Sequence, residues 1–281
     1  MENNNIKKIY NKLKRMKLKY KVEKKKLPLY KEELKSHFIS NDLLSKIDWN
    51  YKSYVIEIND NPEVFINSNS KLPIKILETI VKVKKLCKNK YPLYINLFLT
   101  NERKQLTDKN IIGPHQVNSG ATTTYLDGNE NGKIFIWRKE ELQKVLIHEL
   151  LHAFRMDIHC HDRVSEGHIE ACATLLTILI NLNNFKKFNK EMEKQKKHFE
   201  KQMGKIMFFI DTNKPVIDTH VNEYYFDKAY VLEKPEKFMK YAVNNNFKYN
   251  KDEYKKILND NKDNTNYEIK KRRGKYLNMM Y

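Results

Sequence analysis

The residues with the clearest chemical potential are His148, Glu149 and His152, which form the motif H-E-L-L-H. Two histidines four positions apart lie on one face of a helix, so both imidazoles can reach a single metal ion. The glutamate between them can then hold a water molecule at that metal. The residues around these three, at positions 145–147, 150, 151, 153 and 154, are all uncharged and apolar. The pattern therefore predicts a buried metal-binding helix.

A catalytic zinc ion needs a third protein ligand and keeps a fourth position for water. Glu166, in the segment S-E-G-H-I-E-A, follows His152 by 14 residues, which is enough for one helix to end and a second to return. Glu166 and Glu170 are four positions apart and face one side of that second helix. We predict one Zn²⁺ per chain, bound by His148, His152 and Glu166. Glu170 is expected to orient a ligand histidine through its free ring N–H.

Several alternatives to this ligand set stay open at the level of sequence. The two glutamates could exchange roles. His159 and His161 follow the motif closely and are rival third ligands. The motif could also be a core helix with two incidental histidines, and the glutamate pair could be a solvated acidic face.

The motif H-E-L-L-H followed by E-G-x-x-E at 166–170 resembles the gluzincin zinc peptidases, over roughly residues 94–180. The metzincin pattern would need glycine and histidine where this chain has Arg155 and Ile158. The resemblance implies zinc-dependent hydrolysis of a peptide or protein substrate. Glu149 would be the general base that takes a proton from the attacking water and passes it to the leaving amine.

The segment before the motif suits the same resemblance. Residues 118–137 combine a β-branched stretch, a turn-rich stretch and a short apolar run, which predicts a hairpin leading into the metal helix. In gluzincins the strand before that helix is an exposed sheet edge to which a peptide substrate can add as another strand. By resemblance this edge comprises Asn118, Ser119, Gly120, Ala121 and Thr122, with Gly120 allowing close backbone approach. An ordinary hairpin is the alternative.

The resemblance also implies a donor that stabilises the oxyanion, supplied by a tyrosine or histidine beyond the ligand helix. His220 and Tyr224 are the nearest candidates, and spacing does not choose between them.

The composition bounds the partners and the compartment. The formal net charge is +19, but lysine supplies 47 of the 54 basic residues, and arginine is the usual reader of phosphates and bases. We therefore expect no specific nucleic-acid partner. The sequence has no 18-residue apolar run and no hydrophobic N-terminal segment, so we expect no transmembrane helix and no signal peptide. Three widely spaced cysteines are typical of reduced thiols, and we expect an intracellular, cytoplasmic protein.

The order of apolar patterns predicts an α+β fold. Strands are expected at 54–58 and 93–99, a helix at 73–88 between them, and then the hairpin, the metal helix and the ligand helix. We interpret this as a zincin-like arrangement, in which a small mixed sheet with an exposed edge strand packs on the metal helix. The predicted organisation is a basic, helical N-terminal extension (1–50), a zincin-like catalytic core (51–182) and a mainly helical C-terminal lobe with a basic tail (183–281).

Two other functions compete with hydrolysis. The chain could be a catalytically silent scaffold stabilised by zinc, or a basic polyanion-binding protein in which H-E-L-L-H is accidental. The intact glutamate of the motif disfavours the first, and bound zinc would disfavour the second. The sequence leaves the oligomeric state open.

Overall fold

The computed structural model of the chain describes residues 4–29, 38–106, 110–123, 132–157, 163–217, 228–229 and 231–262. The chain divides into two compact units. The sheet unit comprises residues 16–104 and 118–155, and the helical unit comprises residues 1–15, 105–117 and 156–281. These limits differ from the expected boundaries near residues 50 and 182, because the first helix packs with the C-terminal helices while the segment after it joins the sheet.

The sheet unit is built on six strands. In spatial order they are β1 (Tyr20–Lys24), β2 (Lys52–Ile58), β3 (Asn61–Ser68), β4 (Leu93–Thr100), β7 (Lys133–Arg138) and β6 (Gly120–Thr123). The pairs β3–β4 and β4–β7 are parallel, and the other pairs are antiparallel. The sheet is therefore mixed, which confirms the predicted α+β class. Within the part of the chain that the structure describes, β6 pairs with β7 alone and is the last strand of the sheet.

Local sequence explains the connections between the first strands. Asn59 and Asp60 join β2 to β3 with positive φ angles of 53° and 63°. Two successive residues in the left-handed region match the right-handed twist of a two-residue hairpin, and asparagine and aspartate tolerate that region well. The parallel pair β3–β4 requires a crossover, which α3 (Ile74–Leu86) provides.

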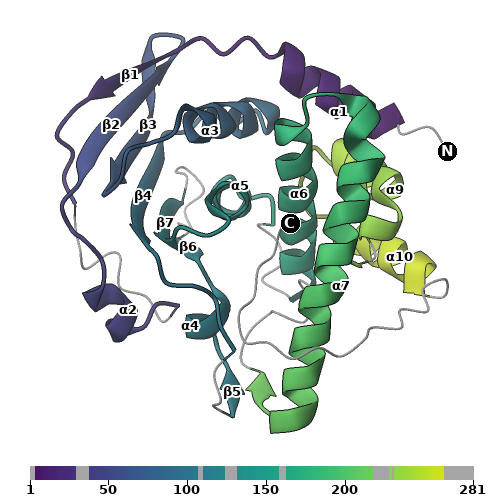
Figure 1. Cartoon of the computed structure of the whole chain (residues 1–281). Coiled ribbons are helices and arrows are strands. Elements are labelled where there is room, and N and C mark those ends of the chain that lie inside the picture. Colours follow the sequence, from purple (N-terminus) through teal and green to yellow (C-terminus); the bar gives the residue numbers. More distant parts are fainter. Residues whose placement is uncertain are drawn as a thin grey trace. The chain divides into compact units, whose positions relative to one another are not determined.

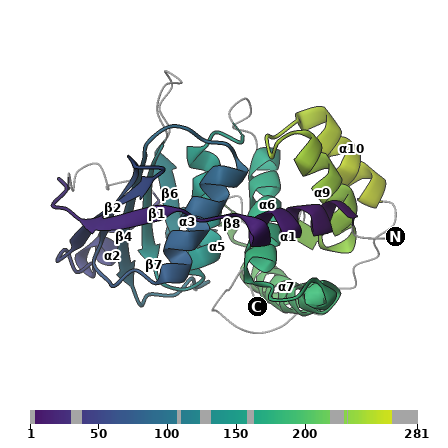
Figure 2. The ribbon, with the colours of Figure 1, turned by 90° about the horizontal axis from the view of Figure 1, so that it is seen from above.

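The sheet is covered on both faces (Figure 1). Helices α3 and α5 (Leu142–Ala153) lie together on one face, and α2 (Asn41–Ser45) lies on the other; the view from above shows the same arrangement (Figure 2). On the α2 face, side chains around that helix form an apolar cluster with residues of β4 and β7: Ile39, Leu43, Ile47, Phe98, Phe135 and Trp137. Burial on both faces explains why β4 and β7 are nearly continuous apolar runs.

The helical unit surrounds one buried helix, α6 (Arg163–Asn181), which packs against the other long helices of the unit. Its long helices are α1 (Asn4–Arg15), α7 (Phe188–Asn213), α9 (Pro235–Asn244) and α10 (Lys251–Lys262). The short elements are β5 (Ile111–Ile112), α4 (Pro114–Val117), the 3₁₀ turn η2 (Phe185–Lys187) and β8 (Val216–Ile217), and β5 pairs with β8. Among the described residues, no helix is both long enough and apolar enough to cross a membrane.

The predicted N-terminal helix is present as α1, which buries Ile6, Ile9 and Leu13. The Glu236 carboxylate accepts hydrogen bonds from the backbone N–H groups of Asn5 (2.7 Å) and Ile6 (3.2 Å). A carboxylate at this place satisfies free N–H groups and favours the helix dipole. The rest of the N-terminal extension differs from the prediction, since residues 20–24 form strand β1.

Candidate metal centre

The motif H-E-L-L-H lies in α5, as the sequence predicts. The helix is buried almost throughout, because the sheet, β6 and α3 all pack against it. His148 is 9% exposed and Glu149 is 6% exposed. Two polar, ionisable side chains held this deep in an apolar helix are costly unless they have bonding partners, so their local geometry is informative.

His148 and His152 face one another across one turn of α5. Their Nε2 atoms are 3.1 Å apart, and their ring centroids are 4.8 Å apart at an interplanar angle of 64°. Two imidazole nitrogens bound to one tetrahedral zinc ion at ~2.0–2.1 Å would be about 3.3 Å apart. The separation of the two nitrogens thus fits two ligands of one zinc ion.

Glu149, between the two histidines, is held from the neighbouring strand β6. The Thr122 hydroxyl donates to Oε2 of Glu149 at 2.7 Å and lies 3.1 Å from the Glu149 backbone carbonyl oxygen. A Cβ atom on Gly120 would lie 3.0 Å from Oε1 of Glu149 and 3.1 Å from Cγ1 of Val145. Glycine at this position therefore permits a close approach between β6 and α5.

The segment predicted to bind substrate, residues 118–122, leads into β6, and its first residues are hydrogen-bonded to β7. The Asn118 carbonyl oxygen accepts a hydrogen bond from Nη1 of Arg138 at 2.8 Å. The Ser119 carbonyl oxygen accepts one from the backbone N–H of Trp137 at 3.0 Å. Gly120, Ala121 and Thr122 then belong to β6 and pair with β7, the one partner of β6 among the described strands.

Arg138 is a contributor that sequence reasoning missed. Its side chain is 4% exposed, and burial lowers the pKa of the guanidinium to about 10. The sequence feature that could have identified Arg138 is its position directly after an apolar run, because a buried cation usually bonds backbone carbonyls or carboxylates. Here it fixes the point at which the chain enters β6.

The two predicted carboxylates lie on α6 in the helical unit. Glu166 is in the first turn of the helix and is partly buried. Glu170 is 1% exposed, and its Oε1 atom is 3.3 Å from Nζ of Lys228, which is also 1% exposed. Glu170 is thus a member of a buried ion pair, so the solvated acidic face is wrong for this residue.

Between the two glutamates, His168 is completely buried. Its Nε2 atom lies 3.0 Å from the Phe247 carbonyl oxygen. Four aromatic rings surround the imidazole at centroid distances of 5.5 to 5.8 Å, those of Phe238, Tyr241, Tyr249 and Tyr254. The segment E-G-H-I-E therefore contributes its histidine to the core of the helical unit.

Of the three predicted ligands, the structure brings His148 and His152 together within the sheet unit, while Glu166 belongs to the helical unit. The other predicted candidates, His159, His161, His220 and Tyr224, lie outside the described residues.

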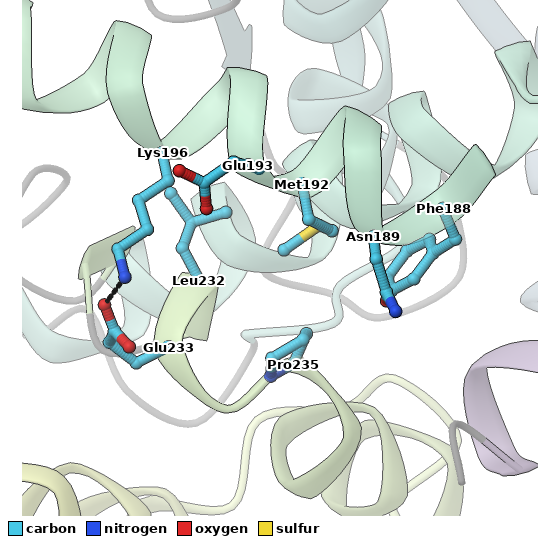
Figure 3. A pocket seen from close by; sticks show the side chains of 8 residues that line it. All are labelled: Phe188, Asn189, Met192, Glu193, Lys196, Leu232, Glu233 and Pro235. Carbon is cyan, nitrogen blue, oxygen red and sulfur yellow. Dashed lines mark ion pairs between the residues drawn. The ribbon is translucent and has the colours of Figure 1, made fainter.

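A separate hollow of about 330 Å³ lies within the helical unit, beside α7 (Figure 3). Its apolar lining comes from Phe188, Met192, Leu232 and Pro235. At one end Lys196 and Glu233 form an ion pair. Because the hollow is open and the charges at that end pair with each other, it offers no arrangement of groups that specifies a ligand.

No protein family model, no curated protein and no solved structure matches this chain.

Proposed function

We propose that the chain is a zinc-dependent peptide hydrolase of the gluzincin type with a zincin-like catalytic arrangement. The observation that carries the proposal is the convergence of the His148 and His152 Nε2 atoms at 3.1 Å, with Glu149 between them on the same buried helix. A mixed sheet that ends beside this helix, and a second helix that carries Glu166, support the same assignment.

In this proposal His148 and His152 bind the zinc ion as neutral imidazoles, and Glu166 is the third ligand. The support for Glu166 is its place in the first turn of α6, the helix that follows the metal helix, as the spacing of 14 residues predicts. When bound, the zinc ion would supply Lewis acidity and activate a water molecule. The role of Glu170 in orienting a ligand histidine stays a prediction. The described contact of its carboxylate is the ion pair with Lys228.

Glu149 is the proposed general base. Its carboxylate would accept a proton from the attacking water and return it to the leaving amine. The Thr122 hydroxyl donates to one carboxylate oxygen, so one place on the carboxylate is bonded and the other oxygen can accept the proton. His220 and Tyr224 keep their predicted role as candidate oxyanion donors.

The proposed substrate is an extended segment of peptide or protein that adds to β6. The support is that, among the described residues, β6 pairs with β7 alone and carries small residues, so a further strand could bond the main-chain groups along its other side. Such pairing would bring the peptide next to the helix that carries Glu149, because β6 itself packs on α5.

The test begins with zinc per chain in the purified full-length protein, measured by elemental analysis. We expect about one zinc in the wild type, its loss in His148→Ala, and its retention in His115→Ala, which changes an exposed histidine outside the motif. Absence of zinc from the wild type would contradict the proposal and favour a basic polyanion-binding protein.

The second step is a peptide-library digest with Glu149→Gln as the paired variant. This substitution keeps the size of the side chain and removes the base, so zinc is retained while hydrolysis falls roughly 10²- to 10⁴-fold. Hydrolysis that is unchanged in Glu149→Gln would refute the mechanism. Zinc without any hydrolysis in the wild type would instead favour a zinc-stabilised scaffold.

A further inference from the structure

Two residues of β6 face α5, and each lies against a different oxygen of the Glu149 carboxylate. Oε2 accepts a hydrogen bond from the Thr122 hydroxyl at 2.7 Å. Oε1 lies 3.0 Å from the position that a Cβ atom on Gly120 would take. Alternate residues of a strand point to the same face, which explains why residues 120 and 122, and not 121, meet the glutamate.

We propose that Thr122 is a positioning residue for Glu149, and this role rests on the proposed hydrolase function. The side chain of a glutamate has three rotatable bonds and keeps one orientation only where its carboxylate is bonded. The Thr122 hydroxyl supplies such a bond from a different element, and Gly120 leaves the space in which the second oxygen lies. The edge strand therefore determines where the base stands.

The orientation of the Thr122 hydroxyl is itself fixed by packing. A Cβ atom on Gly132 would lie only 2.7 Å from Cγ2 of Thr122, so the methyl group occupies the space that glycine leaves free. A threonine whose methyl group has a defined place has a defined χ1 angle, because two heavy atoms on Cβ restrict that angle strongly. The hydroxyl is then directed to Glu149.

In this arrangement the side chain and the backbone of Thr122 have different roles. The side chain bonds the base, while the backbone belongs to the strand that the proposed substrate would join. A displacement of about 1 Å at a reacting group can reduce a rate roughly 10²-fold, so the loss of this bond should appear in turnover and not in substrate binding.

The first test compares Thr122→Val with Thr122→Ser on a peptide identified by the library digest. We expect kcat to fall roughly 10- to 100-fold in Thr122→Val, with KM changed by less than about twofold. Serine restores the hydroxyl and should restore most of kcat. Thr212→Val is the matched control, because Thr212 is an exposed threonine of α7, outside the proposed site. Equal kcat values for Thr122→Val and an active wild type would overturn the proposal.

The second test needs no activity and uses urea unfolding of the metal-free protein. If the Thr122 hydroxyl bonds the Glu149 carboxylate, the stability losses in Thr122→Val and Glu149→Leu will not add in the double variant. Additive losses would overturn the contact. Coupled losses in a wild-type protein that shows neither zinc nor hydrolysis would confirm the contact, but would remove the proposed function and the positioning role with it.

Discussion

Replacing Gly120 by alanine tests how closely β6 packs on α5. The added methyl group would meet Oε1 of Glu149 at 3.0 Å, and Cγ of Glu149 and Cγ1 of Val145 at 3.1 Å each. Overpacking of this kind costs about 1–3 kcal/mol. The reduced freedom of the unfolded chain returns about 0.4–1 kcal/mol. The net expectation is a loss of about 0.5–2 kcal/mol.

The assay is thermal unfolding of the full chain, followed by circular dichroism. For a unit of this size, the expected loss lowers the melting temperature by roughly 2–8 °C. Gly132→Ala is the internal standard, because its Cβ would lie 2.6 Å from the Thr123 carbonyl oxygen, where backbone has to move. It should therefore cost more than Gly120→Ala. A Gly120→Ala protein at least as stable as the wild type would refute the close packing of β6 on α5.

Three further outcomes follow from other features. Burial raises the pKa of Tyr241, so the folded protein keeps the phenol proton above pH ~10 while the unfolded chain loses it. Urea unfolding should therefore show the free energy of unfolding falling as the pH rises past that point, and Tyr241→Phe should reduce this pH dependence. Lys228→Met removes the cation that pairs with Glu170 and should cost about 3–5 kcal/mol in the same assay, whereas the double variant Lys228→Met, Glu170→Leu should recover most of that loss. Chelation of the proposed zinc should lower the melting temperature and added zinc should restore it, and no change on either treatment would count against the metal centre.

The elements around the candidate site follow from local patterns. The apolar surroundings of H-E-L-L-H predict α5, the apolar run at 93–99 predicts β4, and the proline before residue 74 marks the start of α3. Each pattern is read within a single segment, so no distant contact is needed. The same holds for α6, which is apolar along most of its length.

Two strands of the six-stranded sheet, β1 and β3, are not predicted from the sequence, because distant contacts stabilise them. β1 has the sequence Y-K-V-E-K, with mostly exposed side chains, and only its pairing with β2 makes it a strand. β3 carries Asn67, a residue that is rare in buried strands. Its amide accepts a hydrogen bond from the Ser53 hydroxyl at 2.8 Å and donates one to the Asn96 side chain at 3.1 Å. These bonds cross three strands, so no local pattern reveals them.

The contacts that give the site its geometry are also non-local. Thr122 and Glu149 are 27 positions apart, and Glu170 and Lys228 are 58 positions apart. The spacing of H-E-L-L-H singles out Glu149 but contains no information about the hydroxyl that bonds it. The sequence therefore predicts Thr122 as a substrate-binding residue in an edge strand and gives no sign of its side-chain bond to Glu149.

The two outer strands of the sheet differ in a way that bears on how the chain avoids self-association. An unpaired strand edge is a template for any other extended chain, and charged side chains, lysine above all, discourage such pairing. β1 presents Lys21, Glu23 and Lys24 at one end of the sheet, whereas the described residues of β6 at the other end are small and uncharged. Addition of a further strand is thus discouraged at the β1 edge and tolerated at the β6 edge. Aggregation of this protein should therefore begin at β6, and a peptide bound along β6 should reduce it.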